Sequence, residues 1–171
     1  MKKLVLLLSV IFAFSCGDNK KKEDSTVAPI GAPKVEEKAP VAASDDAIAE
    51  ITIEGNDQMK FNKSELRVKA GQKVRLTLKH VGKMEKSVMG HNWVLLALGA
   101  DMAAIGQAGA VAEKTDYIPE EFKDQILVYT KMLGGGETDV IEFEAPAAGS
   151  YDFMCTFPGH YALMKGKLIV E

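Results

Sequence analysis

Cys155-Thr156-Phe157-Pro158-Gly159-His160-Tyr161-Ala162-Leu163-Met164 is the stretch of sequence on which the interpretation of this chain depends. It places a thiol, an imidazole and a thioether within ten residues, with a Pro-Gly turn signal between the first two. A further imidazole stands upstream, at His91 in Met89-Gly90-His91-Asn92-Trp93. Thiolate and thioether suit Cu(I), whereas imidazole also suits Cu(II), so this set can serve both oxidation states. The two stretches together predict an electron-transfer copper site.

The residues just before this stretch predict a strand that ends at Cys155. Tyr151, Phe153 and Cys155 alternate with Asp152 and Met154 on the opposite face. The Cys155 sulfur is therefore expected to point inward from the strand end. Met154 faces the other way, and we interpret it as core packing rather than as a ligand, because methionine commonly fills irregular gaps.

Working outward, short apolar runs separated by frequent turns predict an all-β sandwich or barrel. The clearest half-buried strand is 73–79, where Val74, Leu76 and Leu78 alternate with polar residues. One short helix is expected within 101–113, with Asp101 as its cap, and a helical turn is expected at 119–122. The expected strands are 48–53, 59–61, 66–68, 73–79, 93–98, 126–130, 140–144, 151–155 and 167–170, with a loop over 81–90.

The N-terminal part of the chain has a different character. Residues 1–16 pair a basic start with an apolar run that ends at Ser15-Cys16, which predicts a lipoprotein-type signal peptide. Cys16 would carry the lipid, although Phe14 fits that cleavage pattern imperfectly, and an ordinary cleaved signal is the alternative. Residues 17–47 contain Lys20-Lys21-Lys22 and scattered prolines, which predicts a disordered linker. The folded domain is therefore expected over 48–171, in the periplasm or cell envelope.

Charge and cysteine content limit the possible functions. The chain of 171 residues has a net charge of −3 and no basic stripe with interleaved aromatic residues, so nucleic acid is not an expected partner. Cys16 and Cys155 are the two cysteines, and a disulfide between them would remove the proposed copper thiolate. The domain is expected to hold together through its core and its metal.

The two ligand motifs, together with Gly55-Asn56-Asp57-Gln58-Met59, resemble the azurin family of cupredoxins. The resemblance covers residues 48–171 and implies a Greek-key β-sandwich with one short inserted helix and one copper ion. It implies that His91, Cys155 and His160 hold this copper, with Met164 and the Gly90 carbonyl as distant axial contacts.

The resemblance also implies roles for residues around the ligands. Asn92 matches a residue whose hydrogen bonds tie the two ligand loops together. Around the His160 ring edge it implies an apolar surface for redox partners, here called the docking patch. The docking patch consists of Met59, Met84, Val88, Phe157, Pro158 and Ala162. Tyr161 stands where the family usually has a small residue, and the family's usual disulfide has no cysteines here.

A single-electron carrier without enzymatic activity is the leading functional hypothesis. Its expected partners are redox proteins such as c-type cytochromes or reductases, and lipid at Cys16 would attach it to a membrane. A copper enzyme needs a further histidine-rich centre, and beyond the two proposed ligands only His80 remains. Copper storage or delivery, and structural zinc, are the other hypotheses. For His80 itself, redox-linked titration and a satisfied core histidine are both open.

Overall fold

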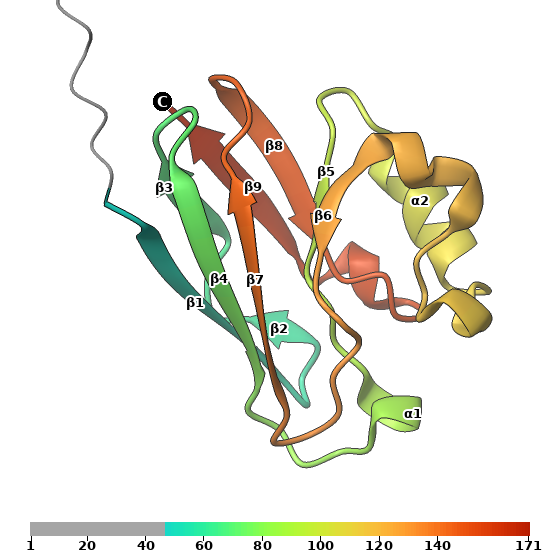
Figure 1. The fold of residues 1–171 in the computed structure, drawn as a ribbon. Helices are drawn as coiled ribbons and strands as arrows, with labels where there is room; N and C mark the ends of the chain where they lie inside the picture. The colour runs from blue at the N-terminus through green and yellow to red at the C-terminus, as the bar shows by residue number, and fades with distance from the viewer. Residues whose placement is uncertain (1–46) are drawn as a thin grey trace, which may run out of the picture. The chain divides into compact units, whose positions relative to one another are not determined.

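The computed structural model describes residues 47–171. The expected signal peptide, Cys16 and all of the expected linker except Ala47 lie outside the described residues. In the described part, the β-strands form two sheets that face each other (Figure 1). The expected all-β sandwich with a short helix is thus confirmed.

One sheet has four strands in the order β2-β1-β4-β7, and the other has five in the order β3-β9-β8-β5-β6. β1 pairs in parallel with β4, and β3 pairs in parallel with β9, whereas the other pairs are antiparallel. The strands are β1 (Ala49–Asn56), β2 (Lys60–Phe61), β3 (Glu65–Val68), β4 (Lys73–His80), β5 (Val94–Leu96), β6 (Ile126–Tyr129), β7 (Thr138–Glu144), β8 (Gly149–Met154) and β9 (Lys165–Val170).

The main core lies between the two sheets. In β4, Val74, Leu76 and Leu78 are buried, as their alternation predicts. Trp93 is fully buried and its ring centroid lies 5.6 Å from that of Phe153. Burying each such side chain contributes about 1.5–3 kcal/mol, so these contacts provide a stable base for the loops at the strand ends.

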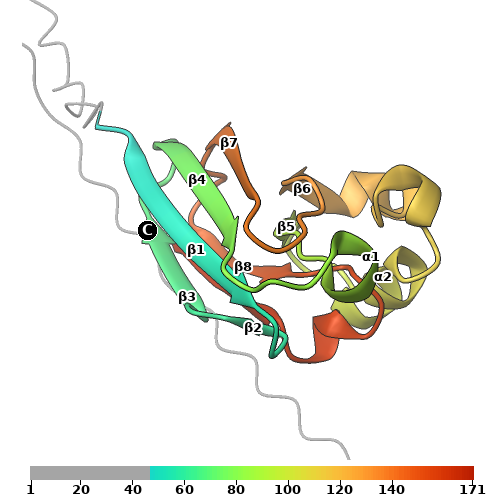
Figure 2. The ribbon, with the colours of Figure 1, turned by 90° about the horizontal axis from the view of Figure 1, so that it is seen from below.

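A second apolar cluster lies under helix α2 (Met102–Gly109), which packs beside β5 and β6 (Figures 1 and 2). Asp101 caps this helix as expected, since its Oδ1 accepts hydrogen bonds from the N–H groups of Ala103 and Ala104, both at 3.0 Å. Met154 packs in this cluster with Ile105, on the face of β8 opposite Cys155. β5 is buried on both faces because the core covers one side and α2 the other.

The structure differs from the expected elements in the short helical segments. The expected loop over 81–90 contains a one-turn helix, α1 (Lys86–Met89), which has no apolar period that the sequence could reveal. The helical turn expected at 119–122 is a 3₁₀ helix, η2 (Glu120–Gln125), preceded by Pro119 as its cap. Two further 3₁₀ turns are η1 (Glu113–Thr115) and η3 (His160–Ala162). Among the described residues, no helix is both long enough and apolar enough to cross a membrane.

Candidate metal centre

His91, Cys155 and His160 meet at one end of the sandwich. Each offers one potential ligand atom, and these three atoms lie within 4.8 Å of one another. All three residues are buried, with exposed fractions of 0%, 0% and 2%. Cys155 follows β8, and His160 begins η3. His91 lies before β5, where it forms an isolated β-bridge with Leu133. Two segments far apart in the sequence therefore present one thiol and two imidazoles to a common point.

Hydrogen bonds within the loop after β8 bring its two ends together. The N–H of Cys155 donates to the Met164 carbonyl at 2.9 Å, and the N–H of Met164 donates to the His160 carbonyl at 2.7 Å. Gly159 adopts a left-handed conformation with φ of 78°, which a glycine takes without strain. The loop thus places His160 Nδ1 at 3.7 Å from Cys155 Sγ and buries Met164 in the same cluster as Cys155.

The orientation of His91 supplies a test of whether a metal fits. Its Nε2–H donates to the carbonyl of Asn56 at 2.9 Å, which leaves a lone pair on Nδ1. This Nδ1 is buried and has no hydrogen-bond partner among the described residues. An unpaired buried polar atom costs about 1–3 kcal/mol, and a metal ion beside Cys155 and His160 would satisfy it. The residues present therefore fit a copper ion.

Burial prepares the three groups differently for metal binding. It lowers the pKa of His91, and it lowers the pKa of His160 to about 4, with repulsion from His91 and His80 adding to the effect. Burial also raises the pKa of the Cys155 thiol to about 12, against the backbone N–H groups of Asn92 and Phe157. Near neutral pH both imidazoles are thus ready to bind, while the thiol must release a proton when metal enters.

Gly55 makes room for Met164, and Gly90 supplies a carbonyl group beside the site. A Cβ on Gly55 would lie 2.7 Å from His91 Cδ2 and 3.2 Å from Met164 Cε, so only glycine lets both side chains approach β1. The carbonyl oxygen of Gly90 lies 3.8 Å from Cys155 Sγ. Met164 and this carbonyl, which the resemblance implies as weak axial contacts, therefore both border the site.

Asn92 links the two ligand segments directly. Its Nδ2 donates to the hydroxyl of Thr156 at 2.7 Å, and its Oδ1 accepts from the Thr156 N–H at 2.9 Å. Both residues are fully buried, and they lie 64 positions apart in the sequence. The pair fastens the segment that carries His91 to the one that carries Cys155.

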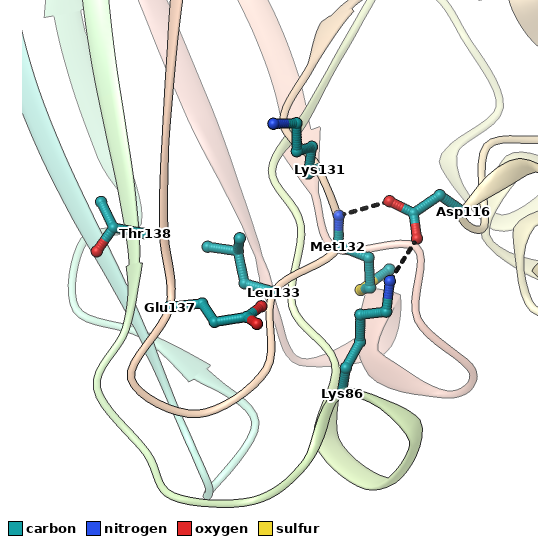
Figure 3. Close-up of a pocket in the computed structure, with 7 residues that line it drawn as sticks. All are labelled: Lys86, Asp116, Lys131, Met132, Leu133, Glu137 and Thr138. Carbon is teal, nitrogen blue, oxygen red and sulfur yellow. Dashed lines mark hydrogen bonds and ion pairs between the residues drawn. The ribbon is translucent and has the colours of Figure 1, made fainter.

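The Asp116 carboxylate holds the segment behind His91, at a cavity of about 470 Å³ (Figure 3). Asp116 accepts a hydrogen bond from the Met132 N–H at 2.8 Å and pairs with the Lys86 ammonium of α1 at 3.2 Å. Leu133, the next residue, exchanges backbone hydrogen bonds with His91 at 2.8 and 3.0 Å. Sequence reasoning missed Asp116, because nothing in a lone acidic residue between two 3₁₀ turns signals this link.

His80 stacks on His91, with ring centroids 4.2 Å apart and an interplanar angle of 16°. Its Nδ1 accepts from the Gly82 N–H at 3.1 Å, and its Nε2 lies 2.7 Å from the Met89 carbonyl. Both ring nitrogens therefore have hydrogen-bond partners, as expected for a core histidine whose hydrogen bonds are satisfied.

The residues of the docking patch are not equally exposed. Met84 and Val88 are 44% and 60% exposed, and Pro158 and Ala162 are exposed as well. Met59 is half-buried, and Phe157 is only 7% exposed because its ring lies 4.7 Å from that of His160. The sequence analysis missed Leu163, which is 62% exposed and follows Ala162 directly.

Tyr161, which stands beside His160 where the family usually has a small residue, packs against helix α2. A Cβ on Gly106 would lie only 2.4 Å from Tyr161 Cγ, so the tyrosine ring rests against the glycine. The ring also packs against the apolar cluster under α2. Tyr161 thus fastens the turn that carries His160 to the helix.

A β-sandwich that closes two imidazoles and a thiol around one point is the architecture of a blue copper protein. The sequence pattern of the family described as copper binding proteins, plastocyanin/azurin family, matches residues 47–171. The chain belongs to this family, and its cofactor is copper.

Individual relatives agree with this assignment. An azurin of Bordetella pertussis is 43% identical over 134 residues, which cover 76% of this chain and 87% of that protein. The outer membrane protein H.8 of Neisseria gonorrhoeae is 42% identical over 121 residues, covering 68% of this chain and 64% of that protein. Among solved structures, auracyanin A, a "blue" copper protein of Chloroflexus aurantiacus, has a TM-score of 0.66 and 37% identity. The match covers 73% of this chain and the whole length of auracyanin A.

Proposed function

We propose that this protein is a single-electron carrier whose copper is held by His91, Cys155 and His160. The ligand atoms would be Nδ1 of each histidine and Sγ of the cysteine. Met164 and the Gly90 carbonyl would be the weak axial contacts. Copper bound there supplies a centre that gains and loses one electron.

The observation that carries this proposal is the state of His91. Its Nδ1 is buried and has no hydrogen-bond partner among the described residues. The hydrogen bond from Nε2–H to the Asn56 carbonyl keeps the proton on Nε2, so the lone pair of Nδ1 is available to a metal ion. The surrounding residues perform the remaining tasks. Asn92 keeps the two ligand segments together, and Phe157 shields the site from water. A closed site of this kind changes little in geometry between two charge states, which favours rapid electron exchange.

The burial of all three ligands also bears on the alternative of copper storage or delivery. A delivery protein has to pass its metal to another protein, which requires ligands that a partner can reach. Here the exposed fractions of His91, Cys155 and His160 are at most 2%. This supports a resident copper ion, and no enzymatic reaction is proposed.

We further propose that the protein works in the cell envelope and that redox proteins such as c-type cytochromes or reductases meet it at the docking patch. The similarity to outer membrane protein H.8 and the sequence around Cys16 support an envelope location with a lipid anchor. Labelled fatty acid incorporated by the natural chain and lost in Cys16→Ala would support the anchor. Equal labelling of the two would contradict it.

The central test of the proposal is the colour of the copper complex. Adding Cu(II) to the copper-free protein is expected to give an intense visible thiolate-to-copper band that ascorbate bleaches reversibly. Cys155→Ser should lack the band, while Met154→Leu, a change in the other cluster, should keep it. A colourless copper complex of the natural protein would refute the carrier. Rapid loss of copper to a mild chelator would favour delivery instead.

A further inference from the structure

Helix α2 has one buried glycine in its interior, Gly106, and a second at its last position, Gly109. Glycine in a helix interior lowers the helix equilibrium about fivefold relative to alanine. The spacing of three residues places both glycines on the same face of the helix. Because α2 has only eight residues, an unfavourable residue in its interior directs attention to what this face contacts.

Gly106 lies directly against the ring of Tyr161. A Cβ on Gly106 would lie 2.4 Å from Tyr161 Cγ and 2.6 Å from Tyr161 Cδ1, which is far inside van der Waals contact. Tyr161 follows His160 in the turn η3, which lies beside α2 (Figures 1 and 2). The absence of a side chain on Gly106 thus makes the space that the ring next to a proposed copper ligand occupies.

Gly109 makes a similar contact near the other ligand of this loop. A Cβ on Gly109 would lie 3.0 Å from Thr156 Cβ and 3.3 Å from the Thr156 carbonyl oxygen. Thr156 follows Cys155 directly and already has two hydrogen bonds to Asn92. The cysteine side of the loop is therefore held from two directions.

The histidine side of the loop is held differently. Among the described residues, the backbone hydrogen bonds of His160 all stay inside its own loop. Its N–H donates to the Phe157 carbonyl at 2.9 Å, and its carbonyl accepts from two N–H groups further along the loop, at 2.7 and 2.9 Å. Such bonds fix the shape of the loop rather than its position on the domain. The contact between Tyr161 and Gly106 joins this turn to a helix of the fold.

We propose that Tyr161 is a positioning residue of the copper site, which acts through His160 and depends on Gly106. The ring rests against the glycine and so keeps the adjacent imidazole at its place beside the Cys155 thiol. A metal ligand whose neighbours are locked by packing releases its metal more slowly than one that can shift. The inference rests on the proposed electron-carrier function and names a residue that keeps the copper of this carrier in place.

Gly106→Ala tests the inference, because helix propensity and positioning predict opposite results. Alanine is the better helix residue, so the variant should be at least as stable as the natural protein if Gly106 has no role at the loop. If Gly106 makes room for the Tyr161 ring, the added methyl group displaces the ring together with His160. The copper-loaded full-length variant should then lose Cu(II) to EDTA about tenfold faster or more, since residues that orient a ligand typically change metal affinity about 10–100-fold.

Variants of Tyr161 and a helix control separate positioning from a loss of stability. Tyr161→Ala should lose copper as fast as Gly106→Ala, whereas Tyr161→Phe keeps the ring and should behave like the natural protein. In the Tyr161→Ala background, Gly106→Ala should add little, because the ring atoms that it would press against are gone. Ala103→Gly is the matched control, since Ala103 is an exposed residue of α2. It weakens the helix away from the loop, so copper loss should stay within about twofold of the natural rate.

Two further measurements identify the cause of any change. Urea unfolding of each copper-free variant reports its stability, and the visible band of each loaded variant reports the position of its ligands. A displaced imidazole alters this band, whereas a loss of stability alone leaves it unchanged. Copper loss at the natural rate in both Gly106→Ala and Tyr161→Ala would overturn the inference, as would equal acceleration by Ala103→Gly.

The test remains decisive if Gly106→Ala does not fold. Tyr161→Ala and Tyr161→Phe are then compared, and equal rates of copper loss would overturn the inference. Failure of the carrier has a different result, because a natural protein that forms no thiolate-to-copper band would refute the copper site itself. A natural protein with the band, whose variants all lose copper at the same rate, would refute the role of Tyr161 alone.

Discussion

Replacing Asn92 by alanine tests how the two ligand segments are held together. The change removes both hydrogen bonds to Thr156 and leaves the Thr156 N–H and hydroxyl without partners in a fully buried position. Each unpaired buried group costs about 1–3 kcal/mol, so the two together predict a loss of about 2–6 kcal/mol. The loss should be measured as the free energy of unfolding in urea, on copper-free protein, so that metal binding does not contribute.

Asn62 provides a matched control for this substitution. Its side chain also makes two hydrogen bonds, accepting from the Glu54 N–H at 2.9 Å and donating to the Glu54 carboxylate at 3.2 Å. Because Asn62 is exposed, water replaces both partners, and Asn62→Ala should cost less than about 1 kcal/mol. Similar losses for the two variants, or a loss below 1 kcal/mol for Asn92→Ala, would refute the argument from burial.

Three further predictions concern the copper site. Copper removal should lower the melting temperature clearly, since the described domain has no disulfide and the metal stabilises the folded state; equal midpoints with and without Cu(II) would contradict this. The copper-free protein should lose stability as pH falls from about 6.5 to about 4, because the unfolded chain then protonates His160 while the folded chain does not. It should also lose stability as pH rises from about 9 to about 12, because only the unfolded chain then ionises Cys155. A free energy of unfolding in urea that stayed constant from pH 4 to 7 would exclude the effect of His160. Gly55→Ala should weaken copper binding at least tenfold in a chelator competition, because its methyl group would press against the His91 ring and Met164; unchanged affinity would show that the ring can move.

Elements with a regular pattern could be predicted from the sequence, and those without one could not. The alternation of residues 73–79 specified a strand with its apolar side chains inward, and β4 has them there. Asp101 marked the start of α2 because a side chain that caps a helix acts on residues two and three positions away. By contrast α1 is a single turn with no buried residue, so no periodicity distinguishes it from the expected loop.

The sequence by itself determined the local part of the site. Cys155, His160 and Met164 belong to one loop, and hydrogen bonds within that loop, after a strand end and a Pro-Gly turn, bring them close together. The sequence also favoured copper as the metal, because thiolate and thioether suit Cu(I) while imidazole also suits Cu(II).

Only the tertiary structure decided which distant groups complete the site. The Asn56 carbonyl that sets the tautomer of His91, the Asp116 carboxylate behind it and the Gly106 surface under Tyr161 come from separate parts of the chain. Their contacts depend on how two sheets and a helix pack, and they leave no period or spacing in the sequence. The chemistry of the ligands can therefore be read locally, whereas their orientation and surroundings arise only when segments far apart in the chain are brought into contact.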